Sequence, residues 1–167
     1  MKIIKSLPKE KAIELGKECS QCHNCCRYGS GALEKEDYET IASFLKISKE
    51  ELKKKYLEEI TKFNTTRYRP KLIRKNKPYG VCIFFDNGCT IHEVKPIECK
   101  IGTCSKHGQE LSIWFALNYY VDPNDAQSIR DWASYLQANP SIEGGSLAEL
   151  VPDKAKLKKI LSYKIIS

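Results

Sequence analysis

Apolar residues recur at helical spacing in two adjacent stretches of the chain. In residues 34–45 one helical face carries Tyr38, Ile41, Ala42 and Leu45. Residues 48–51, Ser-Lys-Glu-Glu, then have the form of a capping box, and the inward positions that follow are Leu52, Tyr56, Leu57 and Ile60. Both patterns predict helices that turn one face toward a core, and the short connection between them predicts a helical hairpin.

Further helices are predicted near both ends of the chain. Pro8 suits the first turn of a helix over residues 9–17, and helices are also expected over residues 112–120 and 125–138, the latter opened by Asp122-Pro123. A final basic helix is expected from Asp153, with its apolar positions at Leu157, Ile160, Leu161 and Ile165. Because this apolar stripe is short, we expect it to pack on the protein's own core rather than on a membrane or an acidic partner.

The middle of the chain has the pattern of strands. Beyond Phe63 it becomes basic and strand-like up to Pro78 and Gly80, and residues 27–31 predict a turn. Residues 81–85 and 89–91 flank the turn Asp86-Asn87-Gly88, which predicts a β-hairpin with Cys82 and Cys89 in its two arms. We therefore predict an α+β fold, namely a mainly helical single domain with a small β-hairpin and a cysteine-rich metal site.

Length and composition fit one globular domain. The chain has 167 residues, of which 41% are hydrophobic and 29% charged, a balance too apolar for a disordered protein. At the amino terminus only Ile3-Ile4 stands where a signal peptide has a continuous apolar stretch, and charged residues interrupt every segment before it reaches the ~18 apolar residues of a membrane span. We expect a cytoplasmic protein with no membrane span.

Eight cysteines form two groups along the chain. The first group is the run CxxCxxCC, formed by Cys19, Cys22, Cys25 and Cys26. The second group is Cys82, Cys89, Cys99 and Cys104. Cytosolic thiols are kept reduced, so clustered ones indicate metal binding; the alternatives are buried thiols or disulfides, but isolated core cysteines do not bunch in this way. We expect all eight to be candidate metal ligands and the segment 19–104 to be the metal-binding core, followed by a helical extension over residues 105–167.

The first three cysteines have the spacing that begins a bacterial ferredoxin run, C-x₂-C-x₂-C-x₃-C-P. The fourth position of that run is missing, because Cys26 directly follows Cys25 and no Cys-Pro comes after it. Adjacent residues project ~100° apart in a helix and ~180° apart in a strand, so Cys25 and Cys26 do not readily serve one small ion. They could serve two neighbouring centres, or one of them could be structural. Our first choice of ligands is Cys19, Cys22 and Cys25 with one cysteine of the second group.

Histidines and acidic residues are secondary candidates. His23, His92 and His107 each lie within three residues of a cysteine and could replace a sulfur, although surface or hydrogen-bonded roles are favoured where thiolates are abundant. Asp37, Glu93 and Glu98 could do acid–base work, but capping or surface roles are favoured. The sequence identifies no catalytic residue, and whether the protein is an enzyme stays open.

The formal net charge of +7 raises nucleic acid or an anionic protein as a partner. That charge counts cysteines as neutral, whereas ligating thiols are deprotonated. Each four-thiolate zinc site would contribute a net charge of about −2, so two would bring +7 down to about +3. The excess Lys and Arg therefore partly balance the expected sites.

Several motifs together resemble the YkgJ-like cysteine-cluster family, named for CxxCxxCC and described as a zinc- or iron-chelating domain. The similar elements are the cysteine run itself, the acidic helix starts at 33–37 and 47–51, the segment Gly80-Val-Cys82-Ile-Phe-Phe, and residues 88–100, Gly-Cys-Thr-Ile-His-Glu-Val-Lys-Pro-Ile-Glu-Cys-Lys. The likeness covers residues 19–104. Departures are Lys95 and Lys100 where arginines are usual, and Gly102-Thr103 where an aromatic-proline pair often sits.

The resemblance implies metal chelation. A related cysteine motif occurs in flagellin lysine methylases that carry an iron–sulfur cluster, which favours iron over zinc, but no glycine-rich turn for a methyl donor is visible and methylase activity is not transferred. We expect an iron–sulfur protein, with a [4Fe–4S] cluster, that acts in redox chemistry, maturation or modification of another protein. The alternative is a non-catalytic module stabilised by Zn²⁺ that binds an acidic protein or RNA.

Overall fold

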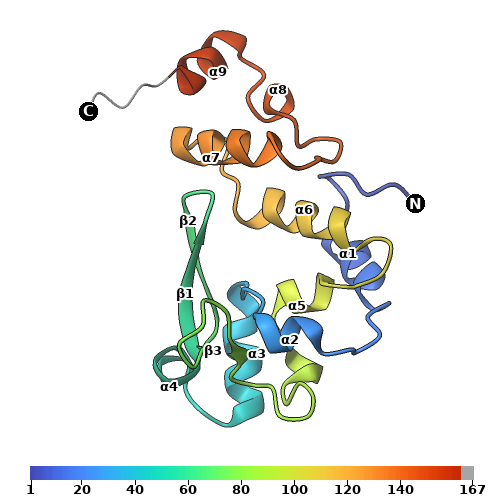
Figure 1. Ribbon diagram of the computed structural model, residues 1–167, viewed down its shortest axis with the longest axis vertical. Helices are drawn as coiled ribbons and strands as arrows, with labels where there is room; N and C mark the ends of the chain where they lie inside the picture. Colours follow the sequence, from blue (N-terminus) through green and yellow to red (C-terminus); the bar gives the residue numbers. More distant parts are fainter. Residues whose placement is uncertain (163–167) are drawn as a thin grey trace.

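The computed structural model describes residues 1–162 and confirms a mainly helical α+β fold (Figure 1). Its helices are α1 (Lys9–Gly16), α2 (Asn24–Tyr28), α3 (Lys35–Leu45), α4 (Lys49–Tyr56), α5 (Ile97–Ile101), α6 (Gly108–Tyr119), α7 (Ala126–Leu136), α8 (Leu147–Leu150) and α9 (Lys154–Leu161), with a 3₁₀ turn at His92–Val94. Its strands are β1 (Leu57–Lys62), β2 (Thr65–Pro70), β3 (Leu72–Ile73) and β4 (Val81–Cys82), which form the antiparallel pairs β1–β2 and β3–β4.

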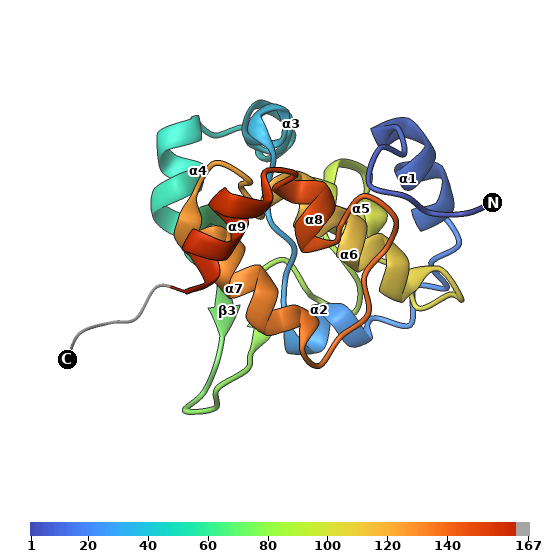
Figure 2. The same cartoon turned by 90° about the horizontal axis from the view of Figure 1, so that it is seen from above.

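Buried apolar side chains form two separate cores. The first core gathers residues of α1 and α5–α9, including Trp114 and Trp132. The second core gathers residues of α3, α4, β1 and β4, including Ile41 and Leu52. Figure 1 shows α7–α9 at one end of the molecule and α3 and α4 at the other, and Figure 2 shows α8 and α9 covering α6 and α7 when seen from that end. The long β1–β2 ribbon runs alongside, between the two ends.

Most predicted helices are confirmed, because local caps and periodicity fix them. Helices α1, α3 and α7 lie within two residues of their predicted ranges, and α6 begins four residues before its predicted start, at Gly108. The side chains of Ser48, Asp125 and Asp153 accept hydrogen bonds from backbone N–H groups in the first turns of α4, α7 and α9. In α9, Ile160 is buried in the first core and Leu157 packs against it, while the predicted position Ile165 lies outside the described residues. No helix of residues 1–162 has the length and apolar character needed to cross a membrane.

The second helix of the predicted hairpin ends earlier than expected. It was expected to continue inward through Leu57 and Ile60, but α4 stops at Tyr56 and Leu57–Lys62 forms β1. The register pairs Leu57 with Pro70 and Lys62 with Thr65. A local helical period does not reveal this strand, because its stability comes from hydrogen bonds to β2.

The predicted hairpin over residues 81–91 is wrong in its pairing. Strand β4 pairs with the earlier strand β3, with Cys82 opposite Leu72, and the expected second arm is reduced to a single bridge between Phe85 and Cys89. The turn itself is present, with Asn87 and Gly88 at positive φ. The backbone N–H of Ile83 donates to the carbonyl of Lys71, so this segment already has a partner on the β3 side.

Short helices at the cysteines were not predicted. The expected turn at residues 27–31 begins later, because Arg27 and Tyr28 belong to α2, and the Gly29 N–H donates to the Cys25 carbonyl. Helix α5, which carries Cys99, and helix α8 were also missed. Helices of four or five residues are too short to show a clear apolar period.

Candidate metal centre

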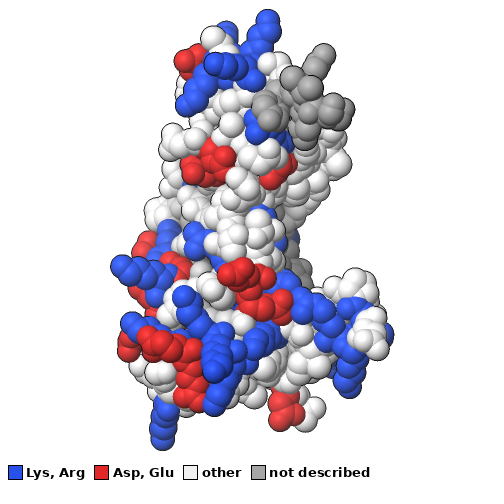
Figure 3. All heavy atoms as spheres, turned by 90° about the vertical axis from the view of Figure 1, so that its left-hand side faces the viewer, with Lys and Arg blue, Asp and Glu red and all other residues white. Residues whose placement is uncertain are grey.

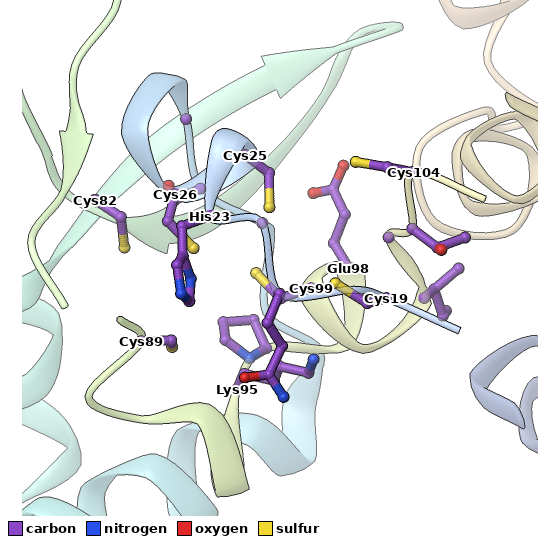
Figure 4. A pocket seen from close by; sticks show the side chains of 18 of the residues that line it. Cys19, His23, Cys25, Cys26, Cys82, Cys89, Lys95, Glu98, Cys99 and Cys104 are labelled. Carbon is purple, nitrogen blue, oxygen red and sulfur yellow. The ribbon is translucent and has the colours of Figure 1, made fainter. Parts of the chain in front are cut away.

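All eight cysteines line one cavity of about 470 Å³ (Figure 4). The cavity lies where the two cores meet, because its wall includes Leu111 and Phe115 of the first core and Cys82 and Ile91 of the second. The two sequence groups, which are more than fifty residues apart, therefore face the same space. The wall contributed by α6 was missed from the sequence, since Leu111 and Phe115 look there like ordinary core positions.

Different elements carry the sulfurs to this cavity. Cys19 and Cys22 lie on the loop after α1, where Gln21 and His23 adopt positive φ, and Cys25 and Cys26 follow in α2. Cys82 ends β4, and Cys89 follows the turn at Gly88. Cys99 lies in α5 and Cys104 just beyond it. The cavity thus brings together a loop, two short helices and a strand end.

The thiols differ in exposure. Cys82 is buried, with 8% of its surface exposed, while Cys19, Cys26, Cys89 and Cys99 are half-buried. Cys22, Cys25 and Cys104 are exposed. The cavity therefore has a protected side and a side open to solvent.

Two sulfurs from the two sequence groups already lie close together. The Sγ atoms of Cys22 and Cys104 are 4.0 Å apart. Tetrahedral geometry with Zn–S bonds of ~2.3 Å puts two thiolate sulfurs ~3.8 Å apart, so this pair is near ligating distance. Within residues 1–162, no three Cys, His, Asp or Glu side chains converge on a single point suited to one ion. Metal binding would thus require thiol side chains to rotate toward a common point inside the cavity. Such a rotation is a change between staggered rotamers.

The electrostatic environment separates the thiols into easily and less easily deprotonated groups. Burial raises the pKa of Cys82 to about 11 and also raises the pKa of Cys89 and of Cys99. Hydrogen bonding between the neighbours Cys25 and Cys26 lowers the pKa of Cys25 and raises that of Cys26.

At the open side, a hydrogen bond from the backbone of Asn24 lowers the pKa of Cys22. The thiol of Cys104 hydrogen-bonds to Cys22, which raises the pKa of Cys104. A bound cation would reverse the penalty on the protected thiols, since metal ligation deprotonates cysteine.

Cys99 is held against the backbone of the loop that precedes α3. A Cβ atom added at Gly31 would lie 2.6 Å from the Cys99 Sγ and 2.8 Å from the Cys99 backbone nitrogen. The neighbouring residue Ala32 donates its N–H to Glu98 Oε2 at 2.6 Å. Only glycine at position 31 permits this close approach.

The secondary candidates fall into two groups. His23 and His92 line the cavity and His107 does not, so two of the three histidines remain near the sulfurs. Glu98 also lines the cavity, whereas Asp37 is a structural residue that caps α3 and accepts the Ile97 N–H at 2.8 Å. Glu93 lies in the 3₁₀ turn and is not part of the cavity wall.

The donor set fits a thiophilic metal. All eight cysteines are free thiols in this structure. Soft thiolate ligands select zinc, copper(I) and iron–sulfur clusters over magnesium or calcium. Lys95 also lines the cavity and supplies positive charge beside the prospective thiolates.

Comparison with known proteins agrees with this chemistry. No curated protein and no solved structure matches the chain. A family model, CxxCxxCC, described as "Putative zinc- or iron-chelating domain", matches residues 18–122. The match extends past Cys104 through α6, so that helix, expected to lie outside the resemblance, belongs to the family region as well as to the cavity wall. With well over half of its length matched, and with every cysteine of the motif facing one cavity, the chain belongs to the CxxCxxCC family.

Proposed function

We propose that the protein carries an iron–sulfur cluster in the eight-cysteine cavity and acts in redox chemistry, maturation or modification of another protein. The observation that carries the proposal is the convergence of eight free thiols on one cavity. Cys19, Cys22 and Cys25 provide three ligands at ferredoxin-like spacing, and one cysteine of the second group provides the fourth. We propose a cytoplasmic location, because eight reduced thiols require a reducing compartment.

When bound, a cluster of this kind would supply one-electron chemistry. The chain's own residues then determine its surroundings. Apolar side chains of α6 and the buried residue Ile91 exclude water from the protected side, which lowers the local dielectric constant around the sulfurs. The positive charge of Lys95 favours the thiolate form and the net negative charge of a cluster.

The cavity also explains why metal should matter for folding. It joins the two hydrophobic cores, and its ligands come from both sequence groups. We propose that residues 1–167 form one domain, with the metal-binding core at 19–104 and a helical extension at 105–167. Part of the free energy of metal binding then stabilises the contact between the cores.

The decisive experiment is a metal and sulfide assay on protein purified without oxygen. We expect a brown protein with broad absorbance in the visible blue that bleaches on oxidation or reduction, and iron with an equal amount of acid-labile sulfide. Colourless protein with stoichiometric zinc and no sulfide would contradict the cluster and favour the second candidate.

The second candidate is a module stabilised by Zn²⁺ that binds an acidic protein or RNA without catalysis. A basic surface next to the cavity favours it. From Arg67 to Tyr79 the sequence contains six Lys or Arg residues and no Asp or Glu. The loop between β3 and β4 borders a second cavity of about 330 Å³ lined by Arg27, Ile73, Arg74, Lys75, Lys77, Tyr79, Gly80 and Val81. We call this surface the basic loop.

The basic loop combines cations with exposed rings. Figure 3 shows it as a protrusion on which Lys and Arg predominate. Tyr28 and Tyr79 are 62% and 43% exposed and meet edge to face with ring centroids 5.5 Å apart. Lys77 lies over the Tyr79 ring at 5.5 Å. Cations and aromatic rings together suit both acidic peptides and single-stranded RNA.

Binding of two labelled probes, an acidic peptide rich in Glu and Tyr and a single-stranded RNA, tests this candidate. The variant Lys75→Glu, Lys77→Glu should abolish binding, whereas Lys154→Glu, Lys158→Glu in α9 makes the same charge change at another site and should preserve it. Equal binding by both double variants would show that the basic loop is not the recognition surface.

A further inference from the structure

We infer that the cavity holds two metal centres, each ligated by four thiolates. The outer centre uses Cys19, Cys22, Cys25 and Cys104, which we call the outer set. The inner centre uses Cys26, Cys82, Cys89 and Cys99, which we call the inner set. The inference rests on the proposed metal-binding function and specifies which sulfurs share a site.

Exposure divides the cysteines along nearly the same line, with Cys19 sharing the half-buried class of the inner set. Three members of the outer set are exposed and the fourth is half-buried. In the inner set one member is buried, the other three are half-buried, and none is exposed. Ligands of one centre should share a depth in the protein, because they surround a common point.

The vicinal pair in α2 separates the two sets. Adjacent helical residues project ~100° apart, so Cys25 and Cys26 do not readily serve one small centre although their thiols are neighbours. Figure 4 shows the Cys26 sulfur on the side of Cys82 and Cys89, and the Cys25 sulfur displaced toward Cys19. Each member of the pair thus has a different group of neighbours.

The outer set supplies the ligand that the ferredoxin-like triple lacks. The Cys104 sulfur lies 4.0 Å from that of Cys22. Three cysteines at C-x₂-C-x₂-C spacing with one remote cysteine form a ligand pattern typical of an iron–sulfur cluster.

The inner set consists of the thiols that remain. Their side chains line the cavity from α2, from α5, from the end of β4 and from the turn after it. Figure 4 places Cys99 between the two groups, and its contact with Gly31 fixes the backbone of α5 at this point. Four protected thiolates with no exposed member suit a closed site, holding either a second cluster or Zn²⁺.

Counting metal centres in the full-length protein tests the inference. Protein purified without oxygen is analysed by native mass spectrometry and by iron, zinc and sulfide assays. Wild type should show two centres per chain, as about eight iron atoms with eight sulfide ions, or about four of each with one zinc ion. Two zinc ions without sulfide would preserve the two centres while contradicting the proposed cluster.

Paired variants assign the ligands. Cys22→Ser, Cys104→Ser should remove only the outer centre, and Cys82→Ser, Cys89→Ser only the inner one, while both pairs together should remove all metal. Ser43→Ala, a change at an exposed residue of α3 outside the cavity wall, should leave both centres. Where a double variant does not fold, a single variant replaces it: Cys104→Ser tests the outer centre and Cys26→Ser tests the inner one.

A wild-type protein with one centre would overturn the inference, and so would loss of all metal in either paired variant that remains folded by circular dichroism. Wild type with no metal at all would contradict the proposed function itself. The two failures are therefore distinguishable.

Discussion

The sulfur atoms of Cys22 and Cys104 lie 4.0 Å apart, although the two residues are 82 positions apart in the chain. Both thiols are exposed; the pKa of Cys22 is lowered by a hydrogen bond from the backbone of Asn24 and by the one to Cys104, and the latter raises the pKa of Cys104. This contact joins the loop after α1 to the segment that follows α5.

We predict that metal-free protein treated with oxidised glutathione forms a Cys22–Cys104 disulfide before any other. Each disulfide formed releases two molecules of reduced glutathione, and the 4.0 Å separation of the two sulfur atoms lets one thiolate attack the mixed disulfide formed at the other. Peptide mapping by mass spectrometry identifies the bond. Metal-loaded protein is the control and should resist the reaction. If the first disulfide formed within residues 19–26, the contact between Cys22 and Cys104 would be contradicted.

We predict that Cys89→Ser, Cys99→Ser lowers both metal content and thermal stability, because the two cysteine groups share sites. A serine hydroxyl stays protonated near neutral pH and is a poor ligand for soft metals. A decrease of about 2 kcal/mol in the free energy of unfolding corresponds to a fall in Tm of roughly 4–8 °C for a chain of this size. Metal analysis and calorimetry of the anaerobic protein measure the two effects. Full metal content in this variant would mean that CxxCxxCC is an independent site.

We predict that Gly31→Ala disturbs metal binding although residue 31 has no ligating group. The added Cβ would lie 2.6 Å from the Cys99 Sγ, so Cys99 or the loop has to move. Overpacking of this kind costs about 1–3 kcal/mol. Gly29→Ala is the matched control, because its nearest neighbour would be the Cys25 carbonyl oxygen at 3.9 Å and its backbone is extended. Equal metal content in the two variants would disprove the contact.

We predict that Glu58→Gln destabilises the protein at neutral pH and that this effect fades in acid. Burial acts to raise the pKa of Glu58, but hydrogen bonds from Arg74 and from the Leu72 N–H hold it below its usual range. The ionised form therefore adds stability above the unfolded pKa of about 4.3, and this stability is lost as the pH falls through the lower folded value.

The side chain of Glu58 is 21% exposed, and loss of its charged hydrogen bonds should cost about 1–3 kcal/mol at pH 7. Denaturant unfolding at pH 7 and pH 3 measures the difference from wild type. Glu51→Gln, which removes a surface pair with Lys55, is the control and should cost no more than about 0.5 kcal/mol. A Glu58→Gln effect that does not shrink at pH 3 would contradict the assignment.

The sequence by itself predicted a thiolate-rich site and determined much of the helical structure. The spacing of Cys19, Cys22 and Cys25 indicated a thiolate metal site, and the family match supports chelation of zinc or iron. Helices α3, α6 and α7 were predictable because caps and apolar periods act over a few neighbouring residues.

Tertiary structure alone decided which distant segments meet. Leu57–Lys62 is a strand because Thr65–Pro70 pairs with it. Strand β4 pairs with β3 and not with residues 89–91, the predicted second arm of its hairpin. The approach of Cys104 to Cys22 depends on how α5 and α6 pack against α1 and against each other. Such contacts join residues far apart in the chain, so they depend on the packing of the whole fold and leave no periodic signal in the local sequence.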